Sequence, residues 1–185
     1  EEGRYKEAGN IKNAVPFLHQ DPDSDEILGQ CEESGRDQGH ATLCVSLMGA
    51  FCQMAYSIGE DLFAFDNYRA VAMAEYVGKY NLIKDEAFNK GTLVGDDFVY
   101  DSNSFPYTSY SNPSYTNTTI STDQRGTKRP AWELFYGYCK AKGISSIYSG
   151  KWAEQMRPDG GGGNYGPNSG GFDQLGFGTL MYYRE

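Results

Sequence analysis

Arg36 and His40 are the residues of this chain whose types and spacing best suit catalysis. They lie four residues apart in the segment EESGRDQGHA, residues 32–41, and His40 is one of only two histidines. If this segment is helical, both side chains project from one face, about one turn apart. An arginine placed there could hold an anionic substrate while the histidine moves a proton. We therefore predict that both residues are catalytic.

A structural role is the alternative for this pair. Polar pairs at this spacing are common on helix surfaces, and Arg36 could simply pair with an acid such as Glu33. Ser34 is followed three residues later by Asp37, which is typical of a helix start. Asp37 would then lie near the positive end of the helix dipole, and the pair would sit at the mouth of a helix.

Candidate substrate-binding residues lie in three other segments. Arg129 belongs to the basic run TDQRGTKRP, residues 122–130, which could receive an anion or could be an ordinary solvated loop. Tyr107 belongs to residues 81–128, where tyrosines alternate with Ser, Thr and Asn, a composition suited to sugar binding. Asn164 and Tyr165 in the glycine-rich tail complete the predicted set. Tyr107 or Tyr165 could also protonate a leaving oxygen.

Helical periodicity predicts the elements that position these residues. The strongest helix spans residues 37–57, and a short connection leads to an antiparallel helix over residues 66–80 that Asp66 and Asn67 would cap. Shorter helices are predicted over 130–142 and 150–156, separated from the first pair by a long irregular segment, residues 81–128. The fold class is therefore mainly α. The residues expected in the core are Leu43, Leu47, Met54, Met73 and Trp132.

Composition limits the ligands and partners. The length of 185 residues allows one substantial core, and the net charge of −9 argues against nucleic acid. The apolar run 41–56 is too short to span a membrane. No cysteine has metal-ligand spacing, so no metal is expected, and a Cys31–Cys139 disulfide cannot be inferred from spacing.

No cofactor is expected either. The tail contains G-x-G-x-x-G, but no strand is predicted before it and Pro167 follows at once, so we reject a dinucleotide site. The glycines of this motif are Gly161, Gly163 and Gly166.

Four separated segments carry a resemblance to a known family. They read GQCEESGRDQGHA, DLFAFDNYRAVAMAEYVGKYNL, RGTKRPAWELFYGY and RPDGGGGNYGPNSGGFDQLGFGTLMYYRE, in this order. The chain resembles the later part of the alginate lyase-like α/α-toroid proteins of polysaccharide-degrading bacteria. The resemblance implies a toroid of antiparallel helical hairpins and a periplasmic or secreted location. We expect residues 1–185 to form a single partial domain, the C-terminal portion of a larger protein, with an exposed apolar face on one flank.

The resemblance also implies an activity and departs from the family at two points. Lyases of this family cleave a uronic-acid polysaccharide by β-elimination, so the expected partner is an anionic polysaccharide or oligosaccharide. The better-known members carry a catalytic tyrosine at the position of His40, and an earlier Asn-His pair that this chain lacks. Two alternatives stay open: a non-catalytic glycan-binding protein, or a glycoside hydrolase that uses Asp37 or Asp173.

Overall fold

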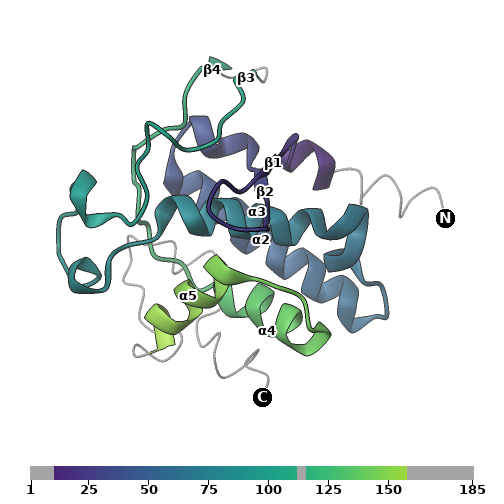
Figure 1. Cartoon of the computed structure of the whole chain (residues 1–185). Helices are drawn as coiled ribbons and strands as arrows, with labels where there is room; N and C mark the ends of the chain where they lie inside the picture. Colours follow the sequence, from purple (N-terminus) through teal and green to yellow (C-terminus); the bar gives the residue numbers. More distant parts are fainter. Residues whose placement is uncertain (1–10, 112–115, 158–185) are drawn as a thin grey trace.

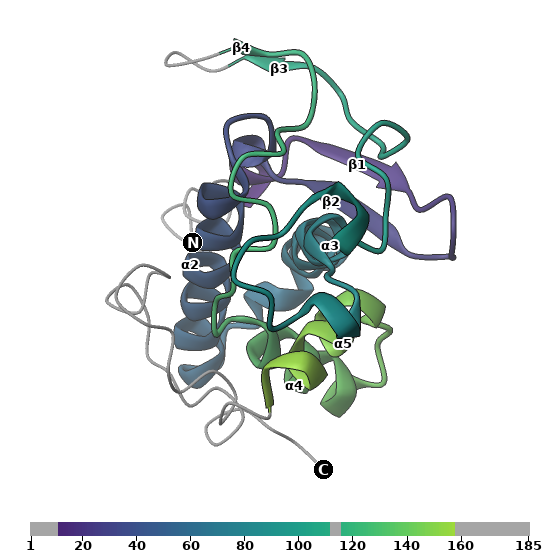
Figure 2. The same cartoon turned by 90° about the vertical axis from the view of Figure 1, so that its left-hand side faces the viewer.

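Helix α3 (Phe65–Asn81) occupies the middle of the fold, and the other α-helices and the first β-hairpin pack around it, as Figures 1 and 2 show. The computed structural model describes residues 11–111 and 116–157. The predicted mainly helical fold is confirmed. The other elements, with η for 3-10 helices, are β1 (Phe17–Gln20), β2 (Ile27–Gln30), η1 (Glu32–Gly35), α2 (Gln38–Ser57), η2 (Leu62–Ala64), η3 (Asp85–Ala87), η4 (Gly95–Asp97), β3 (Tyr110–Ser111), β4 (Thr116–Asn117), α4 (Trp132–Lys142) and α5 (Ile147–Met156).

Helix α3 is buried on all sides over its last twelve residues, 70–81. The β1–β2 hairpin, α2, and the α4–α5 pair each contact it. Three of its buried residues are polar: Glu75, Lys79 and Asn81. Because a buried polar group is costly without a partner, each of these side chains must be satisfied by a neighbouring element. The three therefore fix how the neighbours sit on α3.

Lys79 fixes the β1–β2 hairpin, which is antiparallel with Phe17 opposite Gln30. Its ammonium group donates to the carboxylates of Asp21 and, at 2.6 Å, Asp23 in the hairpin turn. The hydroxyl of Tyr148 in α5 donates to the same Asp21 carboxylate at 2.5 Å. One buried ion pair thus joins the hairpin, α3 and α5.

The face of α2 that packs inward differs from the predicted one. Leu47 and Met54 are 54% and 65% exposed, so the prediction that they are buried is wrong, and Leu43 is only half-buried. Small residues face the core instead, and a β-carbon at Gly49 would lie 2.9 Å from the ring of Phe135. Close helix contact therefore selects the small-residue face, and the larger side chains Leu47 and Met54 are left exposed on α2.

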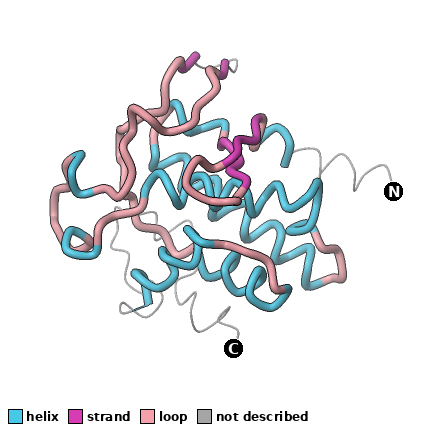
Figure 3. Tube along the Cα trace, viewed as in Figure 1, coloured by secondary structure: helices cyan, strands magenta, loops and turns pink. Residues whose placement is uncertain are grey.

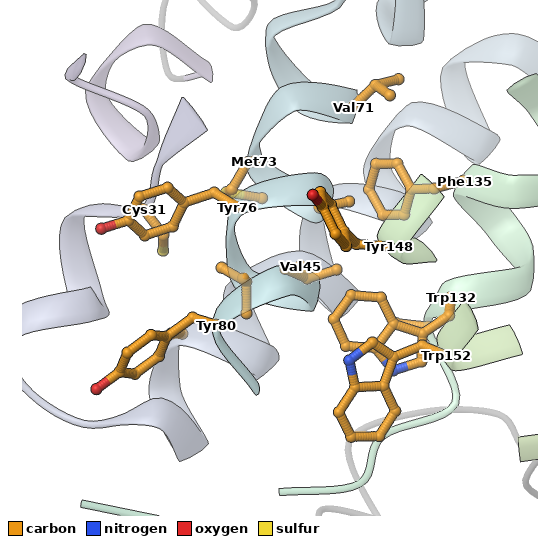
Figure 4. Close-up of a cluster of buried hydrophobic side chains, with 14 of the residues drawn as sticks. Cys31, Val45, Val71, Met73, Tyr76, Tyr80, Trp132, Phe135, Tyr148 and Trp152 are labelled. Carbon is orange, nitrogen blue, oxygen red and sulfur yellow. The ribbon is translucent and has the colours of Figure 1, made fainter. Parts of the chain in front are cut away.

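The predicted helices 130–142 and 150–156 correspond to α4 and α5, which form one aromatic layer against α3. Trp132 and Trp152 stack face to face with ring centroids 5.2 Å apart, as Figure 4 shows, and both are buried. The indole nitrogen of Trp152 donates to the carbonyl of Gly78 in α3 at 2.9 Å. Gly143 follows α4 as its C-cap, in the left-handed conformation that glycine adopts readily.

Two further expectations are settled by local geometry. Asp66 and Asn67 do not cap a helix: both have positive φ, 49° and 57°, in a left-handed turn at the start of α3. The side chain of Asp66 instead accepts a 2.6 Å hydrogen bond from Arg69. The thiols of Cys31 and Cys139 are free, so no disulfide joins them.

The described parts of residues 82–131 contain no α-helix, which confirms the long irregular segment. Figure 3 shows this part as loop interrupted by short turns and by the small β3–β4 ribbon. Among the described residues, no helix is long and apolar enough to cross a membrane.

The different exposure of Met73 and Leu47 leads to a prediction about stability. Met73→Ala should lower the free energy of unfolding by about 2 to 5 kcal/mol because Met73 is fully buried. Leu47→Ala should cost less than about 1 kcal/mol, since its side chain faces solvent. Urea denaturation of both variants measures the difference, and similar costs would mean that Leu47 is covered in solution.

Glu75 leads to a prediction about pH. Its carboxylate caps α5 by accepting from the backbone N–H groups of Tyr148 at 2.7 Å and Ser149 at 3.0 Å, while burial raises its pKa to about 7. The folded protein therefore holds the carboxyl proton of Glu75 more tightly than the unfolded chain, in which the pKa of this group is 4.5. The contribution of this proton to the free energy of unfolding is therefore complete below pH 4.5, the pKa in the unfolded chain. It is lost as the pH rises through about 7, the pKa in the folded protein.

The loss should be on the order of 3 kcal/mol in the free energy of unfolding. Urea denaturation below pH ~5 and above pH ~8 measures it, with Glu75→Gln as a neutral comparison that lacks this slope. Equal slopes in both proteins would show that another group carries the pH dependence.

Candidate functional site

Asp37 joins the two predicted catalytic residues at the start of α2. It is the N-cap, with an extended backbone, and its Oδ1 accepts from the backbone N–H of His40 at 2.8 Å. Its Oδ2 lies 2.6 Å from Nδ1 of His40 and 3.7 Å from Nε of Arg36. Arg36 therefore precedes the helix, and the prediction that both side chains project from one helix face is wrong. A shared carboxylate brings them together instead.

The carboxylate of Asp37 favours one tautomer of the neutral His40 ring. A carboxylate accepts, so Nδ1 carries the hydrogen and Nε2 is the basic nitrogen of the neutral imidazole. The side chain of His40 is 39% exposed, while that of Asp37 is 11% exposed. A buried acid that orients a half-exposed imidazole is an arrangement suited to general base chemistry.

The guanidinium of Arg36 lies between two acids. Its Nη1 is 3.4 Å from Oε2 of Glu33, and its Nε faces Asp37. The side chain is 46% exposed, and a guanidinium has five N–H donors. Arg36 can therefore offer its remaining donors to an anion while these pairs hold its side chain in place. The two acids also reduce the net positive charge at this point.

A loop over residues 121–126 lies against the start of α2. The backbone N–H of Gln38 donates to the carbonyl of Asp123 at 2.8 Å, and that of Ser121 donates to the carbonyl of Ser34 at 2.9 Å. The buried amide of Gln38 donates to the carbonyls of both Ser34 and Ser121 at 3.0 Å. This loop therefore forms one wall beside Asp37.

Asn81 at the end of α3 completes the attachment of this loop. Its Nδ2 donates to Oε1 of Gln38 at 2.9 Å, and its Oδ1 accepts from the backbone N–H of Gly126 at 2.9 Å. Arg125 donates to the carbonyls of Tyr80 and Tyr100, both at 2.7 Å. The loop is thus held at both of its ends by buried polar contacts.

The basic run that includes Arg129 has mainly structural contacts. The guanidinium of Arg125 lies 4.0 Å from the ring centroid of Tyr80, and burial lowers its pKa. Lys128 lies over the ring of Phe88 at 3.7 Å, and Arg129 itself is buried just before α4. The substrate-binding role of Arg129 stays a prediction.

Tyr107 lies in a segment anchored on the β1–β2 hairpin. The side-chain amide of Gln30 donates to the carbonyl of Thr108 at 2.8 Å and accepts from its N–H at 2.7 Å. Tyr107 is half-buried, and burial raises its pKa, which keeps its hydroxyl protonated. Tyr110 is the loop tyrosine that reaches η1, where it hydrogen-bonds Glu32. Asn164, Tyr165 and Asp173 lie outside the described residues.

Sequence reasoning missed the orienting role of Asp37. Its carboxylate accepts from both the backbone and the ring of His40 and faces Arg36, so it is fully engaged. The signal available in the sequence was the acid three residues before the histidine. Among the described residues, no group of three or more His, Cys, Asp or Glu side chains is placed to hold a metal ion.

Substitution of Asp37 should separate its capping role from its orienting role. Asp37→Ala should lower the free energy of unfolding by about 1 kcal/mol because the N-cap acceptor is lost. Asp37→Asn should cost only a few tenths, since an asparagine oxygen also caps well. Thermal or urea unfolding measures both, and an equal loss in the two variants would show that the charge, not the cap, stabilises this turn.

Comparison with known proteins adds no relative. No family model matches the chain, and neither the curated proteins nor the solved structures give a match. The resemblance to alginate lyase-like proteins therefore rests on the four sequence segments. Three of them, residues 29–41, 61–82 and 125–138, lie within the described part of the chain, where Gln38, Asn81 and Gly126 connect them directly.

Proposed function

We propose that this chain belongs to a polysaccharide lyase-like protein that cleaves a uronic-acid polysaccharide by β-elimination, on part of an α/α toroid. The observation that carries the proposal is the shared Asp37 carboxylate, with Nδ1 of His40 at 2.6 Å and Nε of Arg36 at 3.7 Å. This arrangement supplies a base and a cation next to each other. β-Elimination beside a carboxylate needs both.

Each group has a defined part in this reaction. Nε2 of His40 takes the C5 proton, the electrons of the C5–H bond form the C4=C5 double bond, and the C4–O bond breaks. The leaving oxygen takes a proton from water. Arg36 pairs with the substrate carboxylate and stabilises the negative charge that develops beside it. Asp37 holds the ring orientation and stabilises the imidazolium that forms.

The geometry supports the hydrolase alternative less well where Asp37 is its acid or base. Glycoside hydrolysis needs a carboxyl group that gives or takes a proton at the glycosidic oxygen or at water. Asp37 already accepts hydrogen bonds from the backbone and the ring of His40 and faces Arg36, so both of its oxygens are occupied. A lyase also leaves an unsaturated product, whereas a hydrolase does not.

The test is an assay for this unsaturated product by its ultraviolet absorbance, with a panel of uronic-acid polysaccharides. His40→Ala should reduce kcat by about 100- to 10,000-fold with little change in substrate binding, because the base is lost. Arg36→Ala should weaken binding and turnover together, by roughly 10-fold or more in kcat/KM. Circular dichroism confirms that each variant is folded.

His19 supplies the matched control. It is the other histidine, stacks on Tyr76 and contacts Gln30 at 2.9 Å, in the hairpin and not at the start of α2. His19→Gln should therefore keep its activity. Full activity in His40→Ala would overturn the assignment of the base. New reducing ends without an unsaturated product would favour a hydrolase, and binding without cleavage would favour a glycan-binding protein.

A further inference from the structure

Gln124 has an unusual backbone conformation for its residue type. Its φ is 56°, in the left-handed region that side chains with a β-carbon rarely adopt. The residue is exposed, and it lies in the loop that Gln38, Asn81 and Arg125 hold in place. Those anchors act on other residues of the loop, so none of them needs the side chain of Gln124. A glycine would adopt this conformation at lower cost.

The side chain of Gln124 lies directly on the first turn of α2. A β-carbon built on Gly39 would meet Oε1 of Gln124 at 2.3 Å and its Cδ at 2.9 Å. The same point lies 3.2 Å from Oδ1 of Asp37. The glutamine amide and the carboxylate that orients His40 therefore flank one glycine. Any side chain at residue 39 would occupy the place of the amide.

We propose that Gln124 is a specificity-determining residue of the Asp37–His40 site, and that its amide hydrogen-bonds a ring hydroxyl of the uronate unit under attack. An amide carries both a donor and an acceptor, as a sugar hydroxyl does, whereas Arg36 matches the carboxylate. This role would explain the left-handed backbone of Gln124, because that conformation directs the amide toward the turn of α2 that carries His40. This inference rests on the proposed lyase function.

The first experiment separates a binding role from a structural one. In the full chain, Gln124→Gly should keep or raise the melting temperature, since glycine relieves the left-handed strain. It should nevertheless lower kcat/KM on the preferred polyuronate by roughly 10-fold, mainly through KM. Gln124→Asn tolerates the same backbone but is shorter by one methylene, so it should lose activity as well. A purely structural residue would not combine unchanged stability with lost binding.

The second experiment moves the amide without changing Gln124. Gly39→Ala places a methyl group where the amide lies, so it should reduce kcat/KM about as much as Gln124→Gly does. In the Gln124→Gly background there is no amide to displace, and Gly39→Ala should then add little further loss. Thr122→Ala, an exposed change in the same loop, is the control and should behave as wild type.

The outcomes distinguish this inference from the proposed function. An active wild type whose Gln124→Gly variant keeps kcat/KM within about twofold overturns the role of Gln124 and leaves the lyase proposal standing. Fully additive losses in the double variant would also overturn it. If the wild type binds polyuronates without cleaving them, calorimetry replaces the assay, with a roughly 10-fold weaker Kd expected for Gln124→Gly. If it neither binds nor cleaves, both proposals fail.

Discussion

The geometry of the candidate site depends on a buried pair of amides, Gln38 and Asn81. Gln38 belongs to the first turn of α2, and Asn81 ends α3. Between them they bind the carbonyls of Ser34 and Ser121 and the N–H of Gly126. A buried amide that loses its partner costs about 1 to 3 kcal/mol, so each contact enforces the others. Three segments far apart in sequence are thereby held in one arrangement.

The same logic governs the rest of α3. A helix buried on all sides could be wholly apolar, yet Glu75, Lys79 and Asn81 each contact a different neighbour. Apolar packing is non-directional, whereas hydrogen bonds and ion pairs have a defined geometry. These polar residues therefore determine where α5, the β-hairpin and the loop beside the site sit on α3. Apolar contacts such as the Trp132–Trp152 stack add cohesion around them.

Local signals in the sequence predict the helices well, because periodicity and stops such as Gly143 act within one element. They fail where tertiary contacts decide. Leu47 lies on the more apolar stripe of α2, but the helix turns its small residues inward because Phe135 fills the space beside Gly49. Arg36 and His40 meet through the carboxylate of Asp37 and not along one helix face, since an extended Asp37 interrupts the expected helix. No local sequence pattern predicts that the side chain of Gln124 lies against Gly39.

The position of Arg36 and His40 at the positive end of α2 has a consequence for how an anionic chain approaches. The protein as a whole carries a net charge of −9, so it repels such a chain at long range, while the N–H groups of the helix end and the Arg36 guanidinium, whose charge Glu33 and Asp37 partly offset, attract it only on contact. Dissolved ions screen the two effects unequally, since the Debye length is about 10 Å at 0.1 M salt. Encounter with the proposed polyuronate should therefore be fastest at intermediate ionic strength, where distant repulsion is damped and the short-range attraction survives.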